Sequence, residues 1–426
     1  MRLLFLATRY SADPNDPYLT DELAEALIAR GHCVDVLVTD WDAPSSARSG
    51  EVRGRSGERI VKVTPHALRG MGRVMFQASK LLLSSHYAAS AMRRHFGQVR
   101  HDAVIAWTPA LSVAAPLRQC VRRGVRKRLL IIFDFFPMCH REAGIIRSAF
   151  VYVVAKWLED RLYRTFTAFM ANLPGNADYL RRHYPVPETA SVAWSPIWGS
   201  TNMVTASHWK ETRVRLALPV DRPIAVFGGQ LSEGRGIEQI IEAARISERI
   251  GVPTLYLFIG DGRLRTMLEE AARECSSIRL APPVSRDDYL KVVAVCDVGL
   301  VATVKQFTSW AFPSKTIDYL RAGIPIVTAV EPGSDYPELL RPYGLSANVA
   351  SGDAPAMQAA VEAVVKSTSK ERSRIRERAQ RCLDEQFDVR HAVNAVLRAL
   401  GEPVERMNEE RKITEAIDAV TAFAAT

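Results

Sequence analysis

The sequence has few of the features that mark exported, membrane-spanning or metal-binding proteins. Six cysteines occur among its 426 residues, with no C-x-x-C pair and no spacing typical of metal ligands. No stretch approaches the roughly 18 uninterrupted apolar residues of a membrane span, and the opening "MRLLFLATRY" is too short an apolar run for a signal peptide. These absences predict a protein of the reducing cytoplasm that has no zinc site and does not cross a bilayer.

Acidic residues are scarce in one window of a composition otherwise typical of soluble globular proteins. Between Ala43 and Phe133 there are seventeen Arg or Lys and only three acidic residues, Glu51, Glu58 and Asp102. Seventeen against three gives this window +14, more than the net +9 of the chain, so the remainder is mildly acidic. The N-terminal half is therefore expected to face an anionic partner such as a membrane surface, nucleic acid or a phosphorylated substrate.

Several signatures of phosphate, metal and nucleic-acid binding are also missing. The chain contains neither the dinucleotide pattern G-x-G-x-x-G nor the Walker pattern G-x-x-x-x-G-K-[ST]. No acidic cluster of the Asp-x-Asp kind is placed to hold a metal ion, and no motif interleaves aromatic and basic residues as nucleic-acid-binding modules do. We expect no metal, no required cofactor and no nucleic-acid partner.

Apolar runs that read as strands alternate with helical patterns along the chain. The first half has "LLFLAT", "VDVLVT", "AVIAW" and "LLIIFDFFP", with helices over Leu19–Arg30 and Leu111–Arg123. The pattern restarts near 224 with "IAVFGGQLSEGRGIEQIIEAA", followed by "LYLFIGDGRLRTMLEEAA", "CDVGLVAT" and "GIPIVTAV". This alternation is typical of parallel sheets covered on both faces. It predicts an α/β fold of two doubly wound, Rossmann-like domains that face a central cleft.

The restart also divides the chain. We predict a first domain over 1–195, a linker over 196–212 and a second domain over 213–385, with the join in the Pro-, Gly- and Ser-rich "SPIWGSTNMVTASHW", roughly 195–209. The remainder, 386–426, is predicted to be a helix and tail that pack back toward the first domain. Ligands of open parallel sheets bind beyond the carboxyl ends of the strands, so loops of both domains would line the cleft.

The segment "FPSKTIDYLRAGIPIV" (312–327) has the local signals of a loop, a short helix and a buried strand. Pro313 precedes the helix, Ser314 suits its N-cap and Gly323 suits its end. Free N–H groups at such a helix start, the positive end of its dipole and the adjacent Lys315 would bind an anion, most commonly phosphate. The alternative is a capped helix beside an apolar strand, with no ligand.

A glycine loop lies between the strand and the helix near 224. In "FGGQLSEGRG", Gly228 and Gly229 let backbone N–H groups approach an oxygen-rich ligand, and Arg235 is placed to bind a diphosphate with its forked guanidinium. Glycines also form ordinary tight turns, so this loop by itself leaves both interpretations open.

Other residues favour an anion site through their order along the chain. Asp318 lies one helical turn after Ser314, where a carboxylate would accept hydrogen bonds from the vicinal hydroxyls of a ribose. As an alternative, Asp318 is a solvated acid that the helix dipole favours. The turns "GDG", with Gly260 and Asp261, and "PPVSR", with Pro283, belong to the same combination.

This combination, in this order, resembles the nucleotide-sugar domain of family-four retaining glycosyltransferases of the GT-B fold, and is most similar to the branch that works on bacterial surface polysaccharides. The matching segments are "FGGQLSEGRGIEQIIEA", "LFIGDG", "DDYLKVVAVCDVGLVAT", "FPSKTIDYLRAGIPIV" and "DYPELLRPYGLSANVASGD". They cover about 222–366, and "ELAEALIARGHCVDVLV" with "DFFPMCHREAG" extends the resemblance over the first domain.

The resemblance implies a role for each matching position. Arg235 and the backbone at Ser314 and Lys315 would hold the donor diphosphate, and Asp318 would match the family's ribose-binding glutamate. The implied nucleotide-sugar site also includes Gly228, Gly229, Gly260, Asp261 and Pro283.

Two positions depart from the family pattern. Trp310 and Asp318 stand where the family often has two glutamates that flank seven residues. Gln230 stands where an arginine is common, which would leave more of the diphosphate charge to Arg235.

In the first domain, "FDFFPMCHREAG" follows a strong strand, so Asp134 and His140 fall in the loop that would face the cleft. An acceptor hydroxyl loses its proton as a glycosidic bond forms, and Asp or His is suited to receive or orient that proton. The alternative is that Asp134 caps the next helix and His140 is partly exposed.

A basic amphipathic pattern runs from His66 to Phe96. Its polar face carries Arg69, Arg73, Gln77, Lys80 and Ser84. Such a helix can lie on an anionic membrane, although most stripes of this kind are core-packing helices with a solvated face. The resemblance favours membrane contact, because many relatives glycosylate a sugar linked to undecaprenyl diphosphate at the cytoplasmic membrane face.

Together these features predict a retaining, metal-independent glycosyltransferase that is cytoplasmic and peripheral at the inner face of the plasma membrane. The second domain would bind a UDP-, GDP- or dTDP-linked sugar, and the first would bind an acceptor such as a polyprenyl-diphosphate-linked oligosaccharide. Arg235, Asp134 and His140 are the candidate catalytic residues. The alternatives are another GT-B enzyme, either a nucleotide-sugar 2-epimerase or a glycosyl phosphorylase, and a non-catalytic scaffold that binds polyanions or membranes.

Overall fold

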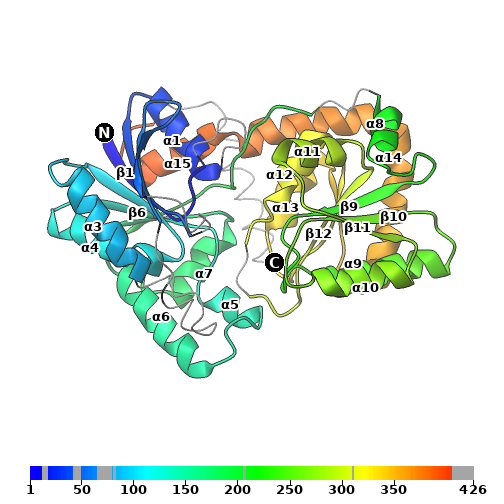
Figure 1. The fold of residues 1–426 in the computed structure, drawn as a ribbon, viewed down its shortest axis with the longest axis horizontal. Helices are drawn as coiled ribbons and strands as arrows, with labels where there is room; N and C mark the ends of the chain where they lie inside the picture. The colour runs from blue at the N-terminus through cyan, green and yellow to red at the C-terminus, as the bar shows by residue number, and fades with distance from the viewer. Residues whose placement is uncertain are drawn as a thin grey trace, which may run out of the picture.

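The computed structural model describes residues 1–11, 18–41, 49–64, 79, 83–204, 208–308 and 311–404, with the backbone alone at 368–370. Two α/β domains lie side by side in it, each built on its own sheet (Figure 1). The described residues include only the second part of the predicted 66–96 helix, and they do not include Trp310.

The first domain contains an eight-stranded sheet in the order β3-β4-β2-β1-β5-β6-β7-β8. All neighbours are parallel except β3 and β4, which pair antiparallel at one edge. The strands are β1 (Arg2–Ala7), β2 (Cys33–Thr39), β3 (Gly50–Arg53), β4 (Arg59–Val63), β5 (Ala103–Trp107), β6 (Lys127–Ile132), β7 (Ala168–Ala171) and β8 (Ser191–Trp194). The helices are α1 (Leu19–Ala29), α3 (Ser84–Phe96), the 3-10 helix η2 (Ala110–Val113), α4 (Ala114–Arg122), α5 (Met138–Glu142), α6 (Ala149–Tyr163) and α7 (Gly175–His183).

The second domain contains a parallel six-stranded sheet in the order β11-β10-β9-β12-β13-β14. Its strands are β9 (Ile224–Gly228), β10 (Leu255–Ile259), β11 (Ile278–Ala281), β12 (Val298–Ala302), β13 (Ile326–Ala329) and β14 (Ser346–Asn348). The helices are α8 (Trp209–Arg215), α9 (Ile237–Arg249), α10 (Arg265–Glu274), α11 (Arg286–Ala294), α12 (Lys315–Ala322), α13 (Tyr336–Leu340), the 3-10 helix η3 (Arg341–Tyr343) and α14 (Ala354–Cys382), which is kinked at Glu371.

Strand β1 shows how the sequence specifies this architecture. Leu4 and Leu6 pack into the core on one face of the first sheet, while Leu3 and Phe5 pack into the core on the other. Successive side chains of a strand point to opposite faces, so a continuous apolar run is needed where both faces are covered. The second sheet also has a core on each face, with α9 and α10 on one and α11 and α12 on the other.

The local signals in the sequence are confirmed with one refinement. The helix expected over Leu111–Arg123 is divided into η2 and α4, and Pro116 lies close to the change. Proline has no N–H to donate to the carbonyl four residues earlier, which disfavours a regular α-helical turn there. As predicted, α12 begins directly after Ser314 and ends at Gly323, whose φ of 68° is left-handed.

The chain crosses between the domains twice. The first crossing follows β8, and the second is a π-helical turn, η4 (Leu383–Phe387). The Gly199 N–H donates to the Phe387 carbonyl at 3.0 Å, so the crossings are joined. Beyond η4, α15 (Val389–Ala399) packs against α1 in the first domain (Figure 1). The two-domain α/β class is confirmed, while the boundaries proposed at 195, 212 and 385 stay predictions.

Candidate active site

Loops from the carboxyl ends of both sheets meet at the boundary between the domains. The loop after β9 brings Gly234 to Ala143, which follows α5, and a Cβ added at Gly234 would lie 3.6 Å from the Ala143 Cβ. After β12, the Thr308 hydroxyl donates to the Glu142 carboxylate and lies 3.5 Å from the Tyr179 hydroxyl on α7. This is where ligands of doubly wound domains are expected to bind.

Asp134 and His140 lie in the first-domain part of this boundary, in the loop after β6 and in α5. The Asp134 N–H donates to Thr108 Oγ1 at 3.3 Å, and Asp134 Oδ1 is buried without a hydrogen-bond partner in the structure. Burial raises the pKa of Asp134, and the nearby His140 and Arg235 oppose that shift. The residue before α5, Pro137, makes no side-chain capping bond, while a hydrogen bond from the Phe136 N–H favours the ionised form of Asp134.

Arg235 and Lys315 lie in the second-domain part of the boundary. The Arg235 side chain reaches solvent, yet the surrounding protein desolvates the guanidinium and lowers its pKa, while Asp134 of the first domain raises it. Desolvation lowers the pKa of Lys315 well below its ordinary value, and the charge of Arg235 adds to the effect. Lys315 Nζ also lies 3.4 Å from the centroid of the Phe227 ring. Two crowded cations that repel each other make a site that an anion would stabilise.

The start of α12 adds backbone donors beside these cations. The N–H groups of Ser314 and Lys315 have no hydrogen-bond partner in the described part of the chain, and the Ser314 hydroxyl makes no capping bond. A helix start left open in this way favours a bound anion. The helix is held by Tyr319, whose buried hydroxyl lies 3.1 Å from the carbonyl oxygens of Val226 on β9 and Leu300 on β12. Tyr319 was not predictable from the sequence, because a buried tyrosine in a helix has no distinctive pattern.

The glycine loops after β9 and β10 stack directly on one another. Gly260 has a φ of +147°, and a Cβ there would lie 1.9 Å from the Gly229 carbonyl oxygen. Gly229 has a φ of +120°, and its N–H donates to the Ile259 carbonyl at 2.9 Å. A Cβ on Gly228 would lie 2.0 Å from the Tyr289 hydroxyl. Glycine is therefore required here by loop packing, and contact of these residues with a ligand stays a prediction.

Asp318, the predicted ribose ligand, has a partner that the sequence did not predict. Both carboxylate oxygens accept hydrogen bonds from Arg286, with Nη1 to Oδ2 at 2.8 Å and Nη2 to Oδ1. Arg286 opens α11 and belongs to the "PPVSR" turn, but it lies 32 residues from Asp318, beyond the reach of helical spacing. The ribose role of Asp318 stays a prediction.

The remaining predicted positions lie on the exposed side of the same loops. Pro283 is exposed in the turn before α11. Asp261 is exposed after β10, where its carboxylate accepts the Gly262 N–H at 2.8 Å. Trp310 lies outside the described residues.

A carboxylate of the first domain also faces the second. Glu22 on α1 has a buried Oε2 atom with no hydrogen-bond partner in the structure. Burial raises the pKa of Glu22 to about 7, against the attraction of Arg321 on α12 and Arg286 on α11. In the sequence Glu22 is one of several acidic residues in a helix, so its position at the domain boundary could not be predicted.

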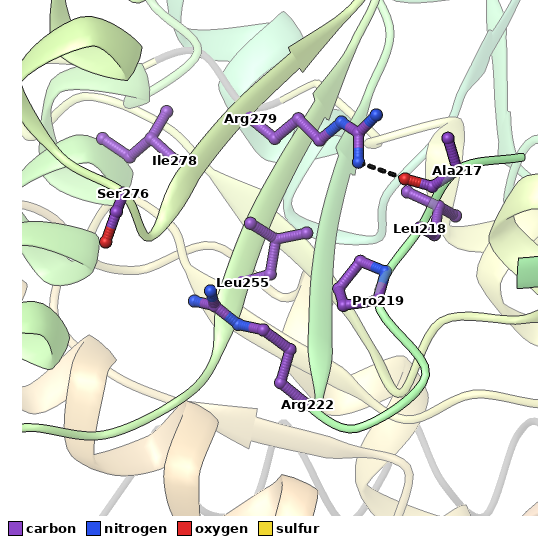
Figure 2. A pocket seen from close by; sticks show the side chains of 8 residues that line it. All are labelled: Ala217, Leu218, Pro219, Arg222, Leu255, Ser276, Ile278 and Arg279. Atoms are coloured by element: carbon purple, nitrogen blue, oxygen red, sulfur yellow. Dashed lines mark hydrogen bonds between the residues drawn. The ribbon is translucent and has the colours of Figure 1, made fainter. Parts of the chain in front are cut away.

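A separate surface pocket lies away from these residues. Figure 2 shows its lining, in which Arg279 donates to the Ala217 carbonyl beside Leu218 and Leu255. The pocket has a volume of about 440 Å³ and lies at the amino ends of β10 and β11. None of the predicted site residues lines it, and it is at the opposite end of the strands from the ligand loops. The candidate site is therefore the one at the domain boundary.

The part of the chain that the structure describes contains neither a cluster of metal ligands nor a membrane span. No three His, Cys, Asp or Glu side chains are grouped there to hold a metal ion. No helix within the same ranges is both long and apolar enough to cross a bilayer. Metal independence and membrane attachment stay predictions.

Comparison with known proteins matches both domains. The family profile described as Glycosyltransferase Family 4 matches residues 18–196, and the profile described as Glycosyl transferases group 1 matches 210–381. WcaI of Escherichia coli K12, named as a colanic acid biosynthesis glycosyl transferase, is 25% identical over 424 residues, which is 93% of this chain and 100% of that protein.

Solved structures show the same fold at low sequence identity. Sucrose-phosphate synthase of Thermosynechococcus elongatus has a TM-score of 0.66 at 14% identity, with 100% of both chains covered. Anabaena Alr3699/HepE in complex with UDP-glucose has a TM-score of 0.64 at 12% identity, covering 94% of this chain and 99% of that one. WaaG, a glycosyltransferase of lipopolysaccharide biosynthesis, has a TM-score of 0.61 at 16% identity, covering 94% of this chain and 100% of that one.

The two parallel sheets and the solved structures of the same fold define a GT-B protein with two Rossmann-like domains. With both family profiles matched in sequence, the chain belongs to the family-four glycosyltransferases of this fold. The family resemblance seen in the sequence is confirmed.

Proposed function

We propose that this glycosyltransferase moves a sugar from a nucleotide-sugar donor to the hydroxyl of a lipid-linked oligosaccharide, with retention of configuration, in the synthesis of a bacterial surface polysaccharide. The observation that carries the proposal is the charge arrangement at the domain boundary. Arg235, Lys315 and the open start of α12 form an anion site, and the carboxylate of Asp134 lies close enough to change the pKa of Arg235. The names of WcaI and WaaG support a polysaccharide acceptor, and the HepE complex supports a UDP-linked donor.

The proposed chemistry uses these groups. The acceptor oxygen bonds to the anomeric carbon on the face from which the diphosphate leaves, so the configuration is retained. The bond between the anomeric carbon and the phosphate oxygen breaks, and the departing diphosphate takes the acceptor proton. Arg235, Lys315 and the backbone N–H groups of α12 stabilise the charge that develops on the diphosphate. Asp134 and His140 orient the acceptor hydroxyl.

The acceptor and the location of the protein form part of the same proposal. A polyprenyl-diphosphate-linked acceptor would be reached from the cytoplasm by a protein peripheral at the inner face of the plasma membrane. The described part of the basic pattern, α3, buries Ala88, Met92 and Phe96 in the core and exposes Arg93 and Arg94. This arrangement fits a helix that is packed on one side and presents positive charge on the other.

The first test is a thermal-shift screen of the protein with UDP, GDP, dTDP and their sugars. A ligand that binds only the folded state raises the midpoint, by roughly 5 °C at a concentration about 100 times its Kd. We expect a shift with one nucleotide, UDP first. The Arg235→Ala variant is expected to bind that nucleotide about ten-fold or more weakly, because it loses a charge-assisted contact.

Arg245→Ala is the matched control. Arg245 is a partly exposed arginine on α9 of the same domain, and it pairs with Glu274 rather than with the site. Its variant is expected to bind the nucleotide like the unmodified protein. No shift with any nucleotide would overturn the proposed donor site and favour the scaffold or phosphorylase alternatives. Equal affinity of Arg235→Ala and Arg245→Ala would overturn the role of Arg235.

A further inference from the structure

The outward side of α6 exposes large apolar side chains to solvent. Phe150 is 77% exposed, Val153 is 61% exposed and Trp157 is 55% exposed. Val154, at 39%, lies between them. The spacing of three and four residues places them along one side of the helix. We call these four residues the α6 ridge.

The opposite side of α6 packs against the domain, so the exposure of the ridge is not due to a helix that is loosely attached. Glu159, Leu162 and Tyr163 are buried there. The Glu159 carboxylate accepts hydrogen bonds from the N–H groups of Ala110 at 2.6 Å and Leu111 at 2.8 Å, both at the start of η2. The helix is therefore fixed in orientation, and its apolar ridge faces away from the domain.

Positive charge flanks the ridge. Arg147 lies just before the helix, and Arg161 and Arg164 lie at its end, all three exposed. The Arg161 guanidinium lies over the Trp157 ring, 5.1 Å from its centroid. The two acids of the helix do not offset this charge, since Glu159 is buried and Asp160 pairs with Lys156 at 2.5 Å.

We propose that the α6 ridge docks on the surface of an anionic phospholipid bilayer. Aromatic and branched apolar side chains would enter the interfacial layer, and the three arginines would lie at the level of the headgroup phosphates. An apolar ridge bordered at both ends by arginines complements that surface in both polarity and charge. This assigns membrane contact to a helix other than the basic 66–96 segment.

The ridge also lies near the predicted acceptor residues. The Tyr152 hydroxyl on α6 donates to Met138 Sδ on α5 at 3.3 Å, and α5 carries His140. Docking would therefore bring the first-domain side of the site close to the lipid surface. That consequence rests on the proposed function, whereas the docking itself does not.

The test is co-sedimentation of the full chain with vesicles of phosphatidylglycerol and phosphatidylcholine, and with vesicles of phosphatidylcholine alone. Phe150→Ser combined with Trp157→Ser is expected to weaken binding to the anionic vesicles about ten-fold or more, since two aromatic side chains that would enter the bilayer interface are lost. Changing Arg147, Arg161 and Arg164 to Gln should weaken it about five-fold per arginine and remove the preference for the anionic vesicles.

The matched control is Val214→Ser combined with Ile250→Ser. These apolar residues are 67% and 57% exposed, and both lie in the second domain. Vesicle binding by this control should stay within about two-fold of the unmodified protein, because its changes spare the ridge. Equal binding by the ridge variant and the control would overturn the proposal. A ridge variant that changes the sedimentation coefficient of the free protein, with vesicle binding intact, would assign the ridge to a second copy of the chain and would also overturn it.

The vesicle experiments use neither a sugar donor nor an acceptor. A failure of the docking proposal can therefore be told apart from a failure of the proposed function. If the protein shows a thermal shift with a nucleotide but does not bind vesicles, only the docking proposal is overturned. Vesicle binding by a protein that shows no nucleotide shift would support the docking surface while overturning the donor site.

Discussion

Asp318 and Arg286 show how one residue pair changes the meaning of a motif. The carboxylate is buried on α12, where the sequence places a group for ribose hydroxyls, but in the structure both of its oxygens are bonded to Arg286. A carboxylate oxygen can accept more than one hydrogen bond, so the pair does not prevent ribose binding. A loss of nucleotide affinity in an Asp318 variant would therefore have two explanations, loss of the ribose contact or loss of the ion pair.

Variants of the two partners separate these explanations. If Asp318 binds the ribose, Asp318→Asn should weaken nucleotide affinity about ten-fold or more, because a hydrogen bond to a charged acceptor is lost. Arg286→Ala breaks the same ion pair but keeps the carboxylate, so we expect its affinity to stay within about three-fold of the unmodified protein. Isothermal titration with the nucleotide found in the thermal-shift screen would measure both. Equal losses in the two variants would show that the ion pair, and not the ribose contact, is what matters.

At the scale of elements, α6 is joined to the strand ends of its domain by Glu159. The carboxylate is fully buried, and burial raises its pKa from 4.5 to about 8, although the Ala110 and Leu111 N–H groups favour the ionised form. The unfolded chain ionises this group above about pH 4.5 and the folded chain only above about pH 8. Between these values the folded state holds more protons, so stability falls as the pH rises.

Glu159→Gln tests this connection between α6 and η2. The NH2 group of the amide would face one of the two backbone N–H donors and leave it unpaired, so we expect a loss of about 1–3 kcal/mol in the free energy of unfolding at pH 5. The variant does not titrate, so its stability should fall less than that of the unmodified protein between pH 5 and pH 8. Scanning calorimetry at pH 5, 6.5 and 8 would measure both effects. Parallel pH profiles for the two proteins would show that Glu159 does not titrate in this range.

The elements themselves were predictable because their signals are local. Continuous apolar runs such as "IAVFG" identify strands covered on both faces, and Gly323 marks the end of α12 through its own backbone conformation. Asp134 and Arg235 could be placed because loops that follow strand ends gather at one edge of a parallel sheet, and Lys315 because it lies at a predicted helix start. Contacts between segments that are far apart in the chain have no local sequence pattern that predicts them. Thr308 and Glu142 are 166 residues apart, and only the assembled fold brings them together.

On the scale of the whole molecule, the last described helix belongs to the first domain. Helix α15 buries Val393 and Val396 against α1 and the first sheet. Polar contacts fix the same docking, since Arg30 donates to the Asn394 side chain at 2.5 Å and Ser191 donates to the Ala399 carbonyl at 2.7 Å. The stability of the first domain therefore depends on residues near the end of the chain.

Val393→Ala combined with Val396→Ala should lower the stability of the first domain by roughly 2–5 kcal/mol, because two buried side chains leave cavities. Hydrogen exchange would show where the loss falls. We expect faster exchange in β1, β7 and α1, while β9 and β12 of the second domain keep their protection. Uniformly faster exchange in both sheets would show that the two domains unfold as a single unit.

The paired crossings have a mechanical consequence. Two chain segments pass from one domain to the other side by side, and the bond between Gly199 and Phe387 ties them into one strap. A covalent connection along one short line favours a rotation about that line, once the contacts across the boundary, such as that of Thr308 with Glu142, have opened. The two domains would then open for substrate entry and close for sugar transfer by the same rotation in opposite directions. Arg235 and Asp134 would return to the same relative position in each catalytic cycle, because the covalent connection as well as the ligand positions the domains.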